Sequence, residues 1–269
     1  MLKNVTLGQF FPGDSFLYHV DPRTKLILVV ALIVLVFLVK SFIGFGLVLL
    51  LVLLCAISTK VGVKYMIRGL KPMFFIIALT FILNLFLMKD GDVLVKLGFI
   101  VITSGGLTTA LFMAIRLIML VLSTQLLTLT TSPIALTDAM ENLLRPLSKM
   151  GFPAHEISMM MSIALRFIPT LMEETGKIRR AQMARGADFE SGNVLARAKA
   201  MIPLLVPLFV SAFRRADELA MAMEARCYRG GDGRTKMKQL KYGWRDAVAA
   251  VVVVALFCAV IVINRVAPV

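Results

Sequence analysis

The sequence predicts an all-α integral membrane protein with about five transmembrane helices and a cytoplasmic region of long amphipathic helices. The first observation behind this prediction is composition: the chain of 269 residues is 59% apolar and 17% charged. Soluble proteins average about 45–50% apolar and about 25% charged residues. The second observation is that the apolar residues fall in long runs without charge, which are typical of membrane spans. This composition argues against a soluble enzyme and against a disordered chain.

The charge of the chain is strongly positive. Thirty Lys and Arg residues against 16 Asp and Glu residues give a formal net charge of +14. On so apolar a chain, this excess indicates cytoplasmic loops at a membrane surface rather than a surface for nucleic acid. We therefore expect a lipid membrane and no nucleic acid among the partners.

The sequence lacks the residue patterns that carry catalysis. It contains no HExxH, CxxC or GxxxxGK[ST] motif, so we expect no phosphate-binding loop of its own. Cys55, Cys227 and Cys258 set no disulfide framework, and His19 and His155 are too far apart in sequence to indicate a local metal site. We expect a non-enzymatic chain with no cofactor and no metal.

The apolar runs divide the chain into three regions. Residues 1–132 form an N-terminal membrane domain, 133–243 a basic helical region, and 244–269 a C-terminal transmembrane helix entered through Trp244 and Arg245. The spans expected in the N-terminal domain are about 26–39, 42–57, 72–88 and 105–130.

The first two spans are short for a bilayer core, which needs about 20 residues. We interpret them as two helices joined by a tight turn near Lys40, and one long helix is the weaker alternative because it would overshoot the bilayer. Asp21-Pro22 reads as a helix start, since Asp can accept the orphan N–H groups and Pro fits the first helical position.

Three features interrupt the pattern of spans. Residues 93–103 are apolar but carry Lys96 and are too short to cross, so we expect them at the surface or packed on the bundle. Arg116 inside a span is either functional or engaged by snorkelling or pairing within the bundle. Asn84 indicates an interhelical hydrogen bond.

The basic residues of the connections predict the orientation. Lys60, Lys64, Arg68 and Lys71 lie in segment 58–71, which holds no acid. By the positive-inside rule this segment is cytoplasmic. The N-terminus and the region 133–243 are then cytoplasmic as well, and the C-terminus lies outside a multi-pass chain in the cell membrane.

The basic region reads as three helices. A short helix begins after Thr131-Ser132-Pro133 and ends near Pro146. A second runs from about 154 to 184 with a kink at Pro169, and a third runs from about 195 to 226 with bends at Pro203 and Pro207. We expect Glu173 and Glu174 on a solvated face of the second helix.

The two long helices share one plan. Each has an apolar first half with a proline, a charged second half, and an Ala-Arg pair before a break. The endings are Ala184-Arg185-Gly186 and Ala225-Arg226-Cys227. An alternative is that each Arg merely favours the negative end of a helix dipole, worth about 0.3–1 kcal/mol.

These motifs resemble the transmembrane T component of energy-coupling-factor vitamin transporters. Cys227 departs from the resemblance, because it stands where the first motif has Gly186. The motifs that carry the resemblance are Gly13-Asp14-Ser15-Phe16-Leu17-Tyr18-His19-Val20-Asp21-Pro22-Arg23-Thr24-Lys25-Leu26, Leu165-Arg166-Phe167-Ile168-Pro169, Ala181-Gln182-Met183-Ala184-Arg185-Gly186 and Glu224-Ala225-Arg226-Cys227-Tyr228.

The resemblance implies a scaffold subunit. Members of that family join two ATP-hydrolysing ABC-type subunits to a membrane substrate-binding subunit that captures a vitamin or metal ion. It implies that region 133–243 is a coupling region in which Ala184, Arg185, Gly186, Ala225, Arg226 and Cys227 dock the two ATPases. The apolar faces would hold the capture subunit, through Ile163, Phe167, Leu204 and Leu208.

A secondary transporter or channel with a basic cytoplasmic domain is the first alternative. Such a protein would need polar residues that converge at mid-membrane, and only Asn84 and Arg116 are candidates. A membrane enzyme would need a catalytic cluster, which the two isolated histidines and the scattered acids do not supply.

Overall fold

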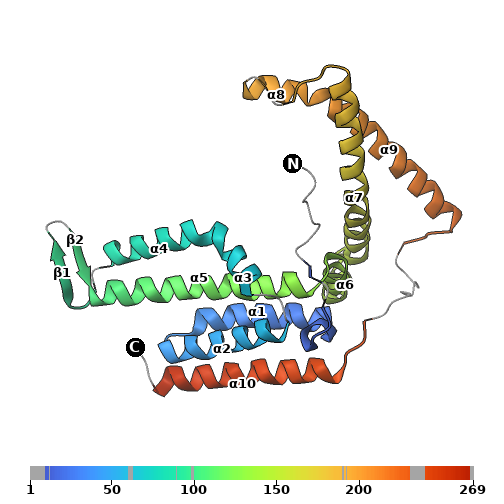
Figure 1. The fold of residues 1–269 in the computed structure, drawn as a ribbon. Coiled ribbons are helices and arrows are strands. Elements are labelled where there is room, and N and C mark those ends of the chain that lie inside the picture. The colour runs from blue at the N-terminus through green and yellow to red at the C-terminus, as the bar shows by residue number, and fades with distance from the viewer. Residues whose placement is uncertain are drawn as a thin grey trace. The chain divides into compact units, whose positions relative to one another are not determined.

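The computed structural model describes residues 10–11, 13–59, 63–88, 90–97, 100–189, 191, 193–230 and 240–266. Helices dominate this part of the chain (Figure 1). It divides into two compact units, which we call the bundle unit (10–139 with 240–266) and the arm unit (140–230). Lys60 of the predicted cytoplasmic segment and residues 231–239 of the predicted coupling region lie outside the described residues.

The bundle unit brings helices from both ends of the chain together. In Figure 1, α1, α2, α5 and α10 lie side by side and α4 runs along α5. The elements are η2 (Phe16–His19), α1 (Pro22–Leu38), α2 (Phe42–Ser58), α3 (Val63–Leu70), η3 (Lys71–Met73), α4 (Phe74–Leu87), β1 (Val93–Leu97), β2 (Ile100–Thr103), α5 (Ser104–Thr130) and α10 (Trp244–Val266).

The core of the bundle unit lies where α1, α2, α5 and α10 meet. Val36 of α1, Val48 of α2, Met119 of α5 and Val260 of α10 are fully buried in one apolar cluster. The side chains of α4, by contrast, are half-buried or exposed, with Phe75 73% exposed. Because lipid is as apolar as these side chains, close van der Waals packing rather than removal from water holds this cluster together.

The first helix starts where the sequence predicts. The side chain of Asp21 accepts a hydrogen bond from the Arg23 N–H at 2.8 Å, and Pro22 is the first helical residue. The Asp21 N–H in turn donates to Oδ1 of Asp246 at 2.7 Å, and Oδ2 of Asp246 accepts from the Gly243 N–H at 2.6 Å. One buried carboxylate therefore ties the beginning of α10 to the beginning of α1.

The other ends of α1 and α10 are tied as well, so the two helices run parallel. The Asn264 side-chain amide donates to the Leu38 carbonyl at 2.8 Å and accepts from the Lys40 N–H at 3.1 Å. A guanidinium nitrogen of Arg116 donates to the Val39 carbonyl at 3.4 Å. The tight turn predicted at Lys40 is confirmed, and Arg116 is engaged within the bundle.

Four described segments are long and apolar enough to cross a membrane: Arg68–Leu87, Ser104–Thr130, Leu195–Ala225 and Trp244–Val266. Three of them overlap predicted spans. The fourth, Leu195–Ala225, lies in the region predicted to be cytoplasmic; it is long and apolar enough because its first half is as apolar as a span. The predicted spans at 26–39 and 42–57 correspond to α1 and α2, of 17 residues each. The protein is a multi-pass membrane protein.

Within segment 93–103, residues 93–97 and 100–103 form two strands, for which the sequence analysis gave no expectation. Strands β1 and β2 pair antiparallel, with Val93 opposite Thr103 and Leu97 opposite Ile100. The segment is rich in β-branched Val and Ile, which favour strands, and so short an apolar run carries no decisive periodicity.

The arm unit contains the end of α6 and the two long helices. The elements of this region are α6 (Pro133–Leu144, which crosses the boundary of the units), η4 (Arg145–Met150), α7 (Ala154–Ala184), α8 (Val194–Ala200) and α9 (Ile202–Ala225). The predicted bounds of α7 are confirmed. The helix predicted over about 195–226, with bends at Pro203 and Pro207, is found as α8 and α9, which are separated at Met201. The interruption lies beside Pro203, which has no N–H and whose ring crowds the preceding turn.

We expect Asp246→Ala to lower the free energy of unfolding by about 1.5–3 kcal/mol, because two backbone N–H groups lose a charged acceptor. Thermal unfolding of the purified chain in detergent measures this change. Asp217→Ala, at an exposed position of α9, is the control and should change little. An equal effect of the two substitutions would contradict a structural role for the Asp246 carboxylate.

Candidate functional site

The first candidate docking end is the C-terminus of α7. Helix α7 ends at Ala184, Arg185 is its C-cap, and Gly186 has a left-handed backbone with φ of +88°. The Gly186 N–H donates to the Met183 carbonyl and the Ala187 N–H donates to the Gln182 carbonyl, both at 3.0 Å. This pair of bonds is the Schellman motif, which satisfies carbonyls that a helix end would leave free.

The end of α9 repeats this geometry. Helix α9 ends at Ala225 with Arg226 as its C-cap. The Cys227 N–H donates to the Glu224 carbonyl at 2.8 Å, and the Tyr228 N–H donates to the Met223 carbonyl at 3.1 Å. The two Ala-Arg motifs therefore share one three-dimensional form.

Cys227 takes the conformation that Gly186 takes in the first motif. Its φ is +55°, and among the described residues it is the only non-glycine residue with positive φ. The left-handed conformation costs a residue with a Cβ roughly 1–2 kcal/mol. The departure from Ala-Arg-Gly noted in the sequence is thus a change of residue at the same backbone position.

Both ends present positive charge. Ala184, Arg185, Gly186, Ala225, Arg226 and Cys227 are all exposed. Among the described residues, no ion pair is recorded for Arg185 or Arg226. An arginine at a helix C-terminus is favoured by the dipole, and its planar guanidinium remains able to pair bidentately with a carboxylate. Each end is therefore a rigid turn with an available guanidinium.

Helices α7 and α9 are fastened to each other by a polar contact that we call the Glu174 clasp. The Ser211 hydroxyl donates to one carboxylate oxygen of Glu174, and Arg215 donates to the other at 3.1 Å. The hydrogen bond from Ser211, followed by the charge of Arg215, holds the pKa of Glu174 below its ordinary value. The expectation that Glu174 lies on a solvated face is wrong, because α9 packs against that face; Glu173 is exposed as predicted.

A second carboxylate fastens the beginning of α7. Glu141 of α6 lies 3.1 Å from Nδ1 of His155 and accepts a hydrogen bond from Ser158 at 2.8 Å. His155 is thus placed in a structural contact between consecutive helices. Sequence analysis missed both carboxylate contacts, since neither follows a local spacing rule.

The four apolar residues expected to contact a capture subunit are not equally available. Leu204 is only 7% exposed, and it shares its helix face with Ser211 and Arg215, which contact α7. Ile163, Phe167 and Leu208 are half-buried. Leu204 therefore packs within the protein and is the least accessible of the four.

Five exposed apolar side chains in the first half of α9 lie on the opposite face. We call these five side chains the α9 stripe. They recur at intervals of three and four residues, which places them on one side of a helix. The stripe consists of Ile202, Leu205, Val206, Phe209 and Phe213, which are 39–69% exposed. A stripe of large apolar side chains on a membrane protein is a contact surface for lipid or for another membrane protein.

The left-handed positions at the two ends generate a prediction. We expect Cys227→Gly to raise the free energy of unfolding by about 1 kcal/mol and Gly186→Ala to lower it by about as much, because only glycine adopts positive φ without strain. A Cβ at Gly186 meets no neighbouring atom, so the backbone alone would cause the loss.

Thermal unfolding of the purified chain measures both changes. Cys258→Ala, an exposed cysteine within α10, is the control and should have little effect. Loss of stability in Cys227→Gly would contradict the left-handed conformation at this position.

Comparison with known proteins identifies the family. The family model CbiQ, described as a cobalt transport protein, matches residues 13–237. A protein of Clostridium kluyveri is 54% identical over 259 residues, which cover 96% of each chain. A protein of Thermosediminibacter oceani is 56% identical over 248 residues, covering 92% of this chain and 93% of the relative. A protein of Bacillus subtilis is 47% identical over 256 residues, covering 95% and 97%.

All three relatives are named energy-coupling factor transporter transmembrane protein EcfT. The resemblance seen in the sequence motifs is confirmed. The chain belongs to the family of transmembrane T components of energy-coupling-factor transporters.

Proposed function

We propose that this protein is the scaffold and energy-coupling subunit of an ATP-driven uptake transporter for a micronutrient, a vitamin or a metal ion. In this proposal it joins two ABC-type ATPase subunits to a membrane substrate-binding subunit and has no catalytic activity itself. The observation that carries the proposal is the matched pair of helix ends, Ala184-Arg185-Gly186 and Ala225-Arg226-Cys227, with the same Schellman geometry and the same exposed guanidinium. Two equal docking ends suit two equal partners.

Each end would dock into a groove of one ATPase. Arginine suits such a contact, because its fork remains charged when partly desolvated and pairs with a carboxylate in two parallel hydrogen bonds. The Schellman turn holds the backbone beside Arg185 and Arg226 in one conformation, so little entropy is lost on docking. The proposal also places the arm unit and the N-terminus on the cytoplasmic side of the membrane, where the ATPase subunits would be.

The long helices would carry movement from the ATPases. Helix α7 has 31 residues and is about 46 Å long at about 1.5 Å per residue. The Glu174 clasp joins it to α9, so that a displacement of one end also moves the other helix. A packed helix pair transmits a rigid-body shift better than two separate helices.

The α9 stripe would hold the substrate-binding subunit. Its side chains are large, exposed and apolar, and the opposite face of α9 is already engaged with α7. The contact would also include the accessible parts of three half-buried side chains, Ile163, Phe167 and Leu208. A secondary transporter or channel is the alternative function, and solute movement by the purified chain without ATPase subunits would favour it.

The docking ends generate the first functional prediction. In Arg185→Glu/Arg226→Glu we expect the ATPase subunits to be lost from the purified complex and uptake to fall, because both guanidinium contacts become repulsive. Each single substitution should be milder, since the second end still holds the complex by avidity. Co-purification and ATP-driven uptake measure the two effects.

The control for this experiment is Arg145→Glu/Arg197→Glu. It makes the same change in charge at two exposed arginines of the arm unit that lie outside the two Ala-Arg motifs. Assembly and uptake should persist in the control. Unaltered assembly in Arg185→Glu/Arg226→Glu would overturn the docking proposal.

The α9 stripe generates the second functional prediction. Phe209 is 60% exposed, so Phe209→Asp should leave the fold intact and remove the substrate-binding subunit from the complex. Leu204→Asp should instead destabilise the chain by several kcal/mol, because it buries a carboxylate without a partner. Co-purification and thermal unfolding distinguish the two outcomes.

Met221→Asp is the matched control for Phe209→Asp. Met221 is 62% exposed on the same helix but lies outside the stripe. Retention of the substrate-binding subunit by Phe209→Asp would count against the stripe as its contact surface.

A further inference from the structure

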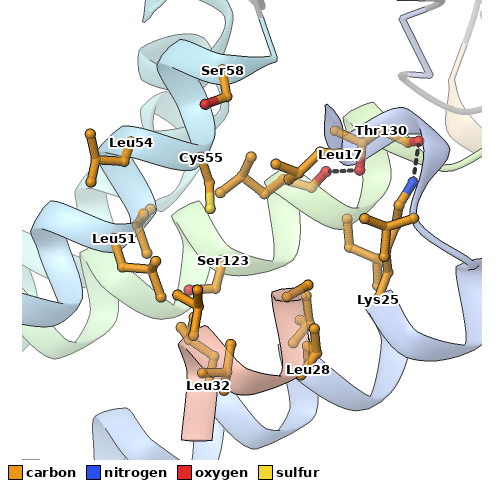
Figure 2. A pocket seen from close by; sticks show the side chains of 18 of the residues that line it. Leu17, Lys25, Leu28, Leu32, Leu51, Leu54, Cys55, Ser58, Ser123 and Thr130 are labelled. Atoms are coloured by element: carbon orange, nitrogen blue, oxygen red, sulfur yellow. Dashed lines mark hydrogen bonds between the residues drawn. The ribbon is translucent and has the colours of Figure 1, made fainter. Parts of the chain in front are cut away.

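The bundle unit contains an apolar cavity of about 260 Å³. Figure 2 shows its walls, which come from η2, α1, α2, α5 and α10. Most of the lining side chains are Leu, Val or Phe; the polar exceptions include Lys25, Ser123 and Thr130. The cavity lies toward the end of the bundle where α1 and α10 begin and α5 ends.

Three of the polar side chains in the wall make hydrogen bonds to backbone carbonyls. The Ser123 hydroxyl donates to the Met119 carbonyl and the Thr130 hydroxyl to the Leu126 carbonyl, both at 2.7 Å. The Lys25 ammonium donates to the Thr130 carbonyl at 3.1 Å, the contact drawn in Figure 2. A buried water needs about 2–4 polar partners, which the apolar walls do not supply.

The most exposed lining side chains lie on α2 and α10, so we infer that the cavity opens between these two helices. Leu54 of α2 and Val248 and Val252 of α10 line it, yet they are 43–53% exposed. Trp244, one turn before Val248, is 68% exposed and contacts Phe16 edge to face. Tryptophan marks the interface of a bilayer, so the opening lies beside the acyl chains just below that interface.

We propose that this cavity binds one acyl chain of a membrane phospholipid, which enters between α2 and α10. Apolar cavities of about 150 Å³ stay free of water and take up benzene. A larger apolar cavity that opens to the bilayer therefore binds part of a lipid instead of water. The surrounding medium at Leu54 and Val252 supplies acyl chains at high concentration.

Photolabelling of the full chain tests the proposal. The chain is reconstituted in phosphatidylcholine vesicles that contain a lipid with a diazirine in one acyl chain, irradiated, and mapped by peptide mass spectrometry. We expect adducts on inward-facing Leu32 and Cys55 as well as on outward-facing Val251, which is 67% exposed. Adducts confined to outward-facing residues would overturn the proposal.

Ala249→Phe fills the cavity, because Ala249 lines it from α10. This variant should lose the adducts on Leu32 and Cys55 and keep those on Val251. Ala247→Phe, the matched control at an exposed position of the same helix, should keep all of them. Val252→Trp at the opening gives the same test if Ala249→Phe does not fold. Undiminished inward adducts in a folded, cavity-filled variant would also overturn the proposal.

Discussion

The structure depends on one constraint: the backbone N–H and C=O groups at the ends of its helices need hydrogen-bond partners. An α-helix leaves N–H groups free at its start and carbonyls free at its end, and lipid offers them no partner. In the bundle unit, Asp246 and Asn264 supply side-chain partners at the two ends of α1. In the arm unit, α7 and α9 close on themselves in Schellman turns. The turns that end the helices are also the structures that present Arg185 and Arg226.

Sequence patterns predicted the elements whose signals are local. Asp21-Pro22 marks the start of α1, and Gly186 marks the end of α7 at the residue found in the structure. The alternation of apolar runs and charged turns predicted the helices of the bundle. A bend at Pro203 was predicted, and the interruption found at Met201 lies two residues before it. The strands at 93–97 and 100–103 were not predicted, because a short β-branched run leaves more than one backbone conformation open.

The contacts that fasten the helices could not be predicted from spacing. Asp246 lies 225 residues from Asp21, and Glu174 lies 37 residues from Ser211. Nothing local distinguishes Glu174 from the exposed Glu173 beside it. Burial of Leu204 likewise follows from which face of α9 turns toward α7. Long-range packing, rather than helical propensity, decides which residues of the arm unit remain available to partners.

The native thiol of Cys227 allows the most direct test of the proposed docking. It is exposed at the end of α9, and Cys55 and Cys258 can be replaced so that it alone carries a photoreactive crosslinker. Crosslinking in intact membranes, followed by mass spectrometry of the trapped protein, identifies what lies against this end. If this end docks an ATPase subunit, the main crosslinked product is an ABC-type ATPase, and its yield changes when ATP binds. A product without any ATPase, from a chain that still supports uptake, would contradict the account.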